Sequence, residues 1–352
     1  MVKITINDNV TKLKQKSKAK NTQDKYDGDW LKFTNYCQNK YLCNPLEVDD
    51  LESAYALTAN YMDWLHEDPE ATVFKGTSNI AGREKINNNP YSASPYKAST
   101  IQRILASITY KYRLNGFQFD RKNPNIAETI SAIVRDEKNL KSSQAKELLK
   151  EDIVKIIDSI PNSEEEYKNI RDKALILIGF YSFCRRSELL GMRFEHLNFA
   201  DDGIQVLIPF SKTDQTGEGR MIFLPATNDK YCPVKALNHW LELAMIESGP
   251  LFYKINKSNT IEKYTMNYKN EKVSLNDASF VLILKKRAAE AGLNDCDKIS
   301  GHSLRIGSIT QARMNGVPTH EIMAQSGHKT TQMIDRYTKL SNIRETSAAK
   351  KI

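Results

Sequence analysis

Most of the chain carries apolar side chains at helical spacing. Near the N-terminus, Tyr26, Trp30, Phe33 and Cys37 recur every three or four residues, which predicts one buried helix face. The other elements expected here are a second helical run over Leu51–Leu65, a long loop at 67–98 that is rich in Asn, Ser, Gly and Pro, and helices over Ser99–Leu114 and Asn125–Ile133. This pattern predicts a small, all-helical N-terminal domain.

The pattern changes after a strongly charged stretch, in which we expect a linker at about 137–147. Two β-type runs, Gly203–Phe210 and Met221–Leu224, flank the segment Ser211–Arg220, whose glycines favour a hairpin with a long loop. Helices are expected over Lys150–Ile160, Glu166–Gly191, Pro233–Met245, Asn276–Ala291, His302–Asn315, Thr319–Ser326 and Thr331–Leu340. The second domain is therefore expected to be mostly helical with a small antiparallel sheet.

These boundaries divide the chain into four parts. We expect a flexible basic arm at 1–20, a helical domain at 21–138, a second domain at 148–341 and a short tail at 342–352. The arm carries six lysines but no apolar run, and an unstructured, solvated terminus would explain it equally well. The fold class is accordingly mainly α, with a second domain of the α+β kind.

Composition narrows the class of protein only a little. The chain has 352 residues, 40% hydrophobic and 27% charged, as expected of a soluble globular protein, and its net charge of +8 favours polyanionic partners. Its longest apolar run, Ala174–Cys184, is too short to span a membrane. The cysteine spacing matches neither a disulfide framework nor a zinc site, so we expect a reducing compartment; the cysteines are Cys37, Cys43, Cys184, Cys232 and Cys296.

Four short motifs in the second domain carry reactive or cationic side chains. Each has an ordinary explanation when taken alone: an intramolecular salt bridge, a solvated lysine, a polar pair on one helix face, or a packed tyrosine. They are Arg185-Arg186-Ser187-Glu188, then Ser211-Lys212-Thr213 in the hairpin loop, then His302-Ser303-Leu304-Arg305, and finally Gly327-His328 followed nine residues later by Tyr337. Their combined order and spacing are much more specific than any one of them.

In this order and spacing, the motifs resemble the tyrosine recombinase, or phage integrase, family across the second domain. The helical segment before them is similar to the core-binding domain of that family, and the two-domain layout looks most like Cre-type recombinases. One departure concerns the first arginine: the family often has Gly-x-Arg there, whereas this chain has Phe183-Cys184-Arg185. Arg186 competes for the same role, but the Arg-x-Ser-Glu spacing selects Arg185.

The resemblance implies a reaction at phosphorus that proceeds through a 3′-phosphotyrosine. Tyr337 would attack the phosphodiester, and Lys212 would protonate the leaving 5′-oxygen as general acid. The residues expected to surround the phosphate are Arg185 and Arg305 as forked donors and His302 and His328 as further donors. His302 is also the best candidate for the base, with Glu188 behind it. The guanidinium groups would do the electrostatic work of a metal ion, so we expect neither a metal nor another cofactor.

The resemblance also suggests which residues contact DNA. Helices near 21–37 and 97–113 would face the grooves, with Lys and Arg on phosphates and Gln102 able to read a base edge. The candidates are Lys97, Thr100, Gln102, Arg103, Lys111 and Arg113, and in the second domain the basic cluster Lys285, Lys286 and Arg287. An ordinary solvated helix face is the alternative for each of them. The histidines without a partner pattern, His66, His196, His239 and His320, are taken as structural.

The expected partner is double-stranded DNA that carries a specific recombination site, bound by a homotetramer on two such sites. The tail at 342–352 would dock onto a neighbouring subunit, unless it is simply a frayed terminus. We expect no membrane association and a location in the cytoplasm with the DNA, or in the nucleus of a eukaryotic host. Two alternatives stay open: a type IB topoisomerase, which shares the chemistry but needs no specific site, and a DNA-binding protein without catalytic activity.

Overall fold

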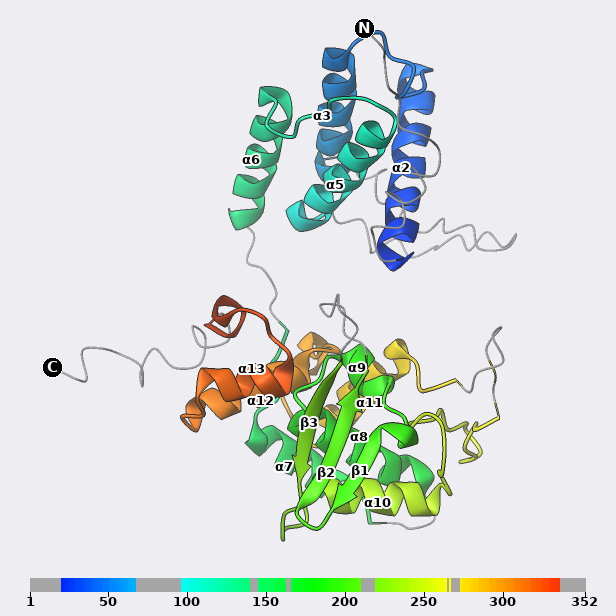
Figure 1. Ribbon diagram of the computed structural model, residues 1–352, viewed down its shortest axis with the longest axis vertical. Coiled ribbons are helices and arrows are strands. Elements are labelled where there is room, and N and C mark those ends of the chain that lie inside the picture. The colour runs from blue at the N-terminus through cyan, green and yellow to red at the C-terminus, as the bar shows by residue number, and fades with distance from the viewer. Residues whose placement is uncertain are drawn as a thin grey trace, which may run out of the picture. The chain divides into compact units, whose positions relative to one another are not determined.

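The computed structural model describes residues 20–67, 96–139, 145–162, 166–209, 219–264, 266 and 273–335. The chain divides into two compact units, Met1–Ser142 and Ser143–Ile352, and the division falls in the stretch expected to be a linker. Each unit is described by itself. The described residues are mainly helical and include one small antiparallel sheet, as the sequence predicts (Figure 1).

The described part of the first unit is built from four helices around an aromatic core. The ring of Phe33 lies between two tyrosines, and the distance between ring centroids is 5.1 Å to Tyr61 and 6.2 Å to Tyr112. The ring of Phe119 stacks on that of Tyr112, with 4.8 Å between the centroids. Aromatic rings bury more apolar area than other side chains, so a few of them can hold a small bundle together. The helices are α2 (Lys20–Tyr41), α3 (Leu51–Glu67), α5 (Ala98–Leu114) and α6 (Pro124–Asn139).

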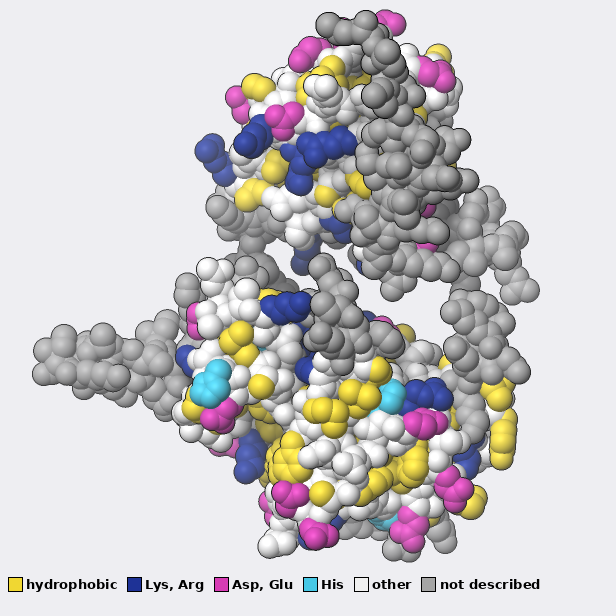
Figure 2. All heavy atoms as spheres, in the orientation of Figure 1, with side chains coloured by type: hydrophobic (Ala, Val, Ile, Leu, Met, Phe, Trp, Pro, Cys, Tyr) yellow, Lys and Arg dark blue, Asp and Glu magenta, His cyan; other side chains and the backbone are white. Residues whose placement is uncertain are grey.

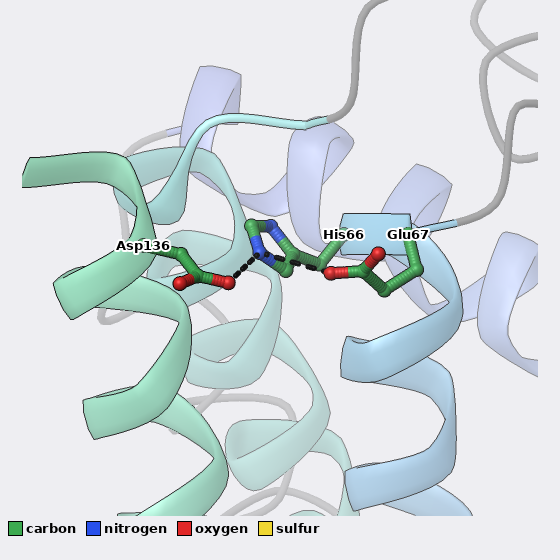
Figure 3. A group of neighbouring side chains, drawn as sticks. All are labelled: His66, Glu67 and Asp136. Atoms are coloured by element: carbon green, nitrogen blue, oxygen red, sulfur yellow. Dashed lines mark hydrogen bonds and ion pairs between the residues drawn. The ribbon is translucent and has the colours of Figure 1, made fainter. Parts of the chain in front are cut away.

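A histidine joins the C-terminal ends of two of these helices. Nε2 of His66, near the end of α3, lies 3.4 Å from a carboxylate oxygen of Glu67 and 3.5 Å from one of Asp136 on α6 (Figure 3). The three ligand-type atoms lie within 4.8 Å of one another, and both carboxylates are exposed. A hydrogen bond between the imidazole and Asp136, beside the solvated carboxylate of Glu67, accounts for this arrangement.

The second unit packs its helices around α8, whose side chains are almost entirely buried. The helix contains the run Ala174–Phe180, which is apolar on every face, and such a helix is stable only when other elements cover it on all sides. Its helices are α7 (Lys150–Ser159), α8 (Tyr167–Tyr181), α9 (Arg186–Leu190), α10 (Pro233–Leu243), α11 (Asp277–Glu290), α12 (Ser303–Met314) and α13 (Thr319–Ser326), with short 3₁₀ turns at Phe194–His196 and Cys296–Lys298 and helical residues at 331–335.

The sheet of the second unit has three antiparallel strands in the order β1-β2-β3. They are β1 (Leu197–Ala200), β2 (Gly203–Ile208) and β3 (Arg220–Pro225), and Ile208 pairs with Arg220 where β2 and β3 meet the hairpin loop. The expected β2–β3 hairpin is therefore present. The strand β1 was not expected, because only one of its four side chains is even partly buried, which leaves no alternation of apolar and polar positions to detect.

The long helix expected over Glu166–Gly191 is wrong. The structure has two helices there, α8 and α9, separated by a turn in which Phe183 adopts a left-handed conformation with φ of 57°. Such a backbone cannot continue an α-helix. The sequence conceals this break, because apolar residues continue through the turn. No described helix is long and apolar enough to cross a lipid bilayer.

Candidate active site

The turn between α8 and α9 positions the first motif. Arg185 is the residue that precedes α9, and its backbone N–H donates to Oε2 of Glu188 at 2.9 Å. The same carboxylate accepts a second hydrogen bond, 2.7 Å long, from Nη1 of Arg185 to Oε1. The three-residue spacing therefore makes Glu188 cap the helix and hold the Arg185 side chain at once. Arg186 instead points to Asp277, with its Nη2 2.6 Å from Oδ2 of that residue. Of the two neighbouring arginines in this motif, Arg185 is therefore the one that faces the site.

The second arginine comes from α12 and meets the first motif from another direction. Arg305 is buried, with 4% of its surface exposed, and its Nη1 donates to the carbonyl of Phe183 at 2.7 Å. That nitrogen also lies 4.0 Å from Oε2 of Glu188. A buried guanidinium is strongly destabilising unless hydrogen bonds and an opposite charge compensate it, and these two contacts supply both.

His328 supports this arginine directly. Nη2 of Arg305 lies 2.9 Å from Nε2 of His328, and since arginine only donates, that nitrogen must accept. Nδ1 lies 2.8 Å from Oγ of Ser326, to which the imidazole donates as the neutral tautomer. Burial, and then the charges of Arg305 and Arg185, lower the pKa of His328 to about 4. In this arrangement His328 lies against Arg305, and its expected role as a donor to the phosphate stays a prediction.

His302 lies at the start of α12, on the solvent side of the site. Its residue is exposed, in contrast to Arg305 three positions later in the same helix. The pKa of His302 is lowered, first because the imidazole is partly removed from water and then by the charges of Arg186, Arg305 and Arg185. A lowered pKa keeps this imidazole neutral at neutral pH, the state in which it can accept a proton.

One residue of this cluster was missed in the sequence. Arg220, the first residue of β3, donates from Nη2 to Oε2 of Glu188 at 2.8 Å. Its side chain lies on the same face of the strand as the buried Ile222 and Leu224, so the two-residue period of β3 could have indicated that it points inward. It was missed because it stands at the end of Ser211–Arg220, the segment expected to be the hairpin loop.

The Glu188 carboxylate is therefore shared by several guanidinium groups. Only 2% of its side chain is exposed. Burial acts to raise the pKa of Glu188, but the hydrogen bonds and charges of Arg220 and Arg185 outweigh it and the pKa is lowered. Three positive charges, from Arg185, Arg220 and Arg305, face this one negative charge, and the surplus makes the cluster suited to an anion such as a phosphodiester. Lys212 and Tyr337 lie outside the described residues.

Comparison with protein families identifies the kind of protein to which this site belongs. The model of the phage integrase family matches residues 146–344, which includes every motif named above. The chain belongs to the phage integrase family. It is thus a tyrosine recombinase, an enzyme that cleaves and rejoins DNA at specific sites.

Individual recombinases are similar over nearly the whole chain. An integrase/recombinase, a XerD homologue of Selenomonas ruminantium, is 31% identical over 333 residues, which cover 94% of this chain and 84% of that protein. Among solved structures, a post-cleavage complex of the XerH recombinase with a palindromic difH substrate has a TM-score of 0.52 at 16% identity, over 85% of this chain and 71% of the other. A lambda integrase dimer bound to a COC′ core site has a TM-score of 0.51 at 17% identity, over 94% and 93%. At these identities the two structures support the recombinase fold alone.

The recombinase's candidate DNA contacts differ in their surroundings. Lys97, directly before α5, and Gln102 on α5 are exposed. Several Lys and Arg side chains gather on the face of the first unit that Figure 2 shows. Three other candidates contact the protein itself. Arg103 pairs with Asp29 and Lys111 pairs with Asp27 at 2.5 Å, while Nε of Arg113 donates to the carbonyl of Phe119 at 3.1 Å. Each still has donors with which a phosphate could be bound.

The three basic residues of α11 also differ in how far they are committed to contacts within the protein. Lys285 donates to the carbonyl of Asp297 at 2.7 Å, and Lys286 is exposed and lies 3.6 Å from Glu290. The assignment of Arg287 as a DNA contact is wrong, because the residue is only 5% exposed. Its guanidinium donates to Asp172 at 2.8 Å, to Asn169 at 2.7 Å and to Glu290 at 3.0 Å, and is thereby committed to the protein core.

Proposed function

We propose that this recombinase cleaves DNA with Tyr337 as nucleophile and with the guanidinium groups of Arg185 and Arg305 on the nonbridging phosphate oxygens. The phenolic oxygen of Tyr337 bonds to phosphorus while the bond to the 5′-oxygen breaks, which leaves a 3′-phosphotyrosine. Lys212 gives its proton to the departing 5′-oxygen. The reverse sequence, on a different 5′-hydroxyl, rejoins the strands.

The observation that most supports these roles is the shared Glu188 carboxylate. It accepts hydrogen bonds from Arg185 and lies 4.0 Å from Arg305, so residues 120 positions apart are fixed around one point. Fixed donors stabilise the charge that builds up on phosphorus oxygens more effectively than water does, because they need no reorganisation during the reaction.

His302 is the proposed base that takes the proton of Tyr337. A phenol has a pKa near 10, so the attack needs a proton acceptor. The pKa of His302 is lowered, which supports a neutral imidazole at physiological pH. His328 then has a supporting part, because its Nε2 already accepts a hydrogen bond from Arg305.

We further propose that the partner is double-stranded DNA with a specific site, bound by a homotetramer that joins two such sites. The XerH and lambda integrase complexes named above contain their own specific DNA sites, and the lambda enzyme is a dimer there. On this chain, exposed Lys97, Gln102 and Lys286 are the proposed direct contacts. The tail at 342–352, outside the described residues, is proposed to dock onto the neighbouring subunit.

The test begins with the covalent intermediate itself. Fragmented genomic DNA of the host is incubated with wild-type protein, with Tyr337→Phe and with Tyr264→Phe, in which an 83% exposed tyrosine is replaced as control. DNA that stays attached after denaturation is then sequenced. We expect adducts at one enriched sequence for the wild type and the control, and none for Tyr337→Phe.

Two results would contradict the proposal in different ways. An adduct that persists in Tyr337→Phe would remove this tyrosine from its role. Adducts spread over DNA without sequence preference, together with relaxation of a supercoiled plasmid that carries no enriched site, would indicate a topoisomerase activity instead.

A further inference from the structure

The β2–β3 hairpin contributes a guanidinium to the active site from a position outside the four sequence motifs. Arg220 opens β3, and 15% of its side chain is exposed. Its Nη2 donates to Oε2 of Glu188 at 2.8 Å and lies 3.6 Å from Sγ of Cys184. It therefore binds the oxygen that also accepts from the backbone N–H of Arg185.

The other side of the Arg220 guanidinium lies against Gly327. A Cβ built on Gly327 would be 2.9 Å from Nη1, 3.0 Å from Cζ and 3.1 Å from Nε of Arg220, distances that real Cβ atoms do not tolerate without displacement. Gly327 ends α13 with φ of 70° and directly precedes His328. A side chain at position 327 would therefore strain the left-handed backbone and would displace the Arg220 guanidinium packed on it.

Arg220 consequently connects three parts of the site. It touches the carboxylate that aims Arg185, it lies under the turn that presents His328, and it belongs to the hairpin whose loop contains Lys212. Its positive charge also contributes to the lowered pKa of His328, after burial, Arg305 and Arg185.

Stability alone does not account for an arginine here. Nε of Arg220 is buried and has no hydrogen-bond partner among the described residues, which costs free energy. The charge of Glu188 is already balanced by Arg185 and the nearby Arg305, so Arg220 is not needed to neutralise it. An unsatisfied buried donor within a cluster of charged groups is one mark of a functional site.

We propose that Arg220 is a positioning residue for strand cleavage, which acts by holding the Glu188 carboxylate against Arg185 and by supporting the Gly327–His328 turn. This rests on the proposed roles of Arg185 and His328. Arg220 does not touch the phosphate in this proposal. It fixes Arg185, which does, and the turn of His328, whose imidazole lies against Arg305, and a misplaced guanidinium loses much of its effect on the transition state.

The experiment compares Arg220→Met, which keeps the apolar stem, with Arg220→Lys, which restores a positive charge. Arg193→Met is the matched control, because that arginine is 42% exposed and pairs only loosely with Glu195 at 3.4 Å. Cleavage is measured at saturating protein on a nicked duplex that carries the site recovered from the wild-type adduct, and affinity for the same duplex is measured separately. Wild-type cleavage in this assay establishes the underlying function independently of Arg220.

We expect Arg220→Met to bind the duplex about as tightly as the wild type, and to cleave it about tenfold more slowly or worse. Arg220→Lys should recover part of the rate, and Arg193→Met should match the wild type. In the DNA-free protein with ¹³C-labelled histidines, the NMR titration of His328 should move to higher pH in Arg220→Met only, which a general loss of packing would not produce. Wild-type cleavage by Arg220→Met would overturn the proposal, and so would a loss of affinity with unchanged cleavage at saturation.

A second pair of variants keeps the proposal testable if Arg220→Met does not fold. Gly327→Ala places a methyl group against the Arg220 guanidinium, whereas Gly316→Ala has the same left-handed strain, with φ of 76°, and open space around it. Cleavage should fall in Gly327→Ala well beyond the effect of Gly316→Ala. Equal rates in the two variants would mean that the position of Arg220 does not matter for cleavage.

Discussion

The carbonyl oxygen of Phe183 accepts a hydrogen bond of 2.7 Å from Nη1 of Arg305, across a separation of 122 residues. Phe183 has a φ of 57°, in the left-handed region that residues other than glycine rarely adopt. This conformation ends α8 and turns the carbonyl toward the arginine of α12. The strained residue is therefore the point at which two of the four sequence motifs are joined.

Replacing Phe183 should separate its backbone strain from its side-chain packing. Phe183→Ala and Phe183→Gly both remove the ring that packs against the small apolar cluster of Ile309, Ala312, Ile322 and Ile334. Only glycine relieves the backbone, so we expect Phe183→Gly to be more stable than Phe183→Ala by about 1 kcal/mol. At Leu282, an exposed position inside α11, the order should be reversed by a similar amount. Urea unfolding of the four variants measures both differences in stability. If alanine is more stable than glycine at position 183 as well as at position 282, the backbone of Phe183 is not strained.

The contacts of Arg287 predict a loss of stability in place of a loss of DNA binding. Arg287→Met removes a buried guanidinium that Asp172 and Asn169 depend on, which should lower the free energy of unfolding by about 3 kcal/mol. Lys286→Met, at an exposed neighbour, should change it by about 0.5 kcal/mol or less.

For DNA affinity we expect the opposite result: Lys286→Met should bind DNA more weakly, and Arg287→Met should bind it as the wild type does. Measured at a temperature where both are folded, affinity should fall only in Lys286→Met, together with a salt dependence that is shallower by about one ion. Weak DNA binding by fully folded Arg287→Met would restore that residue to the DNA interface.

Much of this architecture could be predicted from the sequence, and the reasons differ between elements. The long apolar run of α8 and the two β-type runs of the β2–β3 hairpin are strong patterns, and both elements are present. The break between α8 and α9 could not be predicted, because the Phe183 turn is set by tertiary contacts of its carbonyl and ring rather than by a local glycine or proline. The motifs identified Arg185, Arg305 and His328 because their spacing is local and specific. Arg220 acts through a strand face and a contact with a distant helix, which no short motif records.

The burial of His328 predicts how stability depends on pH. The pKa of His328 is lowered to about 4 in the folded protein, against an ordinary value of about 6.5. The unfolded chain therefore binds a proton first as the pH falls, so the stability that His328 contributes is complete above about pH 6.5 and is lost progressively toward pH 4, by about 3 kcal/mol in all. The pKa values of His302 and His196 are lowered as well, so they add to the loss with the same sign.

Asparagine at position 328 should remove this part of the pH dependence. We expect the difference in unfolding free energy between pH 7 and pH 5 to be smaller in His328→Asn than in the wild type. His320→Asn, which replaces a histidine with an 83% exposed side chain, should leave that difference unchanged. Chemical denaturation of the three proteins at both pH values measures it, and an undiminished difference in His328→Asn would mean that the imidazole titrates normally.

The leaving group gives the sharpest test of Lys212. Departure of the 5′-oxygen as an alkoxide is unfavourable without a proton, because an alcohol is as weak an acid as water, whereas a thiolate leaves readily from a group whose pKa is about 8.5. Lys212→Ala should therefore cleave an ordinary phosphodiester at least about a hundredfold more slowly, the usual contribution of a general acid. It should cleave a duplex with a 5′-bridging phosphorothiolate at nearly the wild-type rate.

Two control variants make the test specific. Lys254→Ala, at a 58% exposed lysine paired with Glu262, should behave as the wild type on both substrates. Arg185→Ala should be slow on both, since its guanidinium stabilises charge on the nonbridging oxygens, which the sulfur substitution does not change. If Lys212→Ala is equally slow on the two substrates, the proton comes from another group and Lys212 has a different part in the reaction.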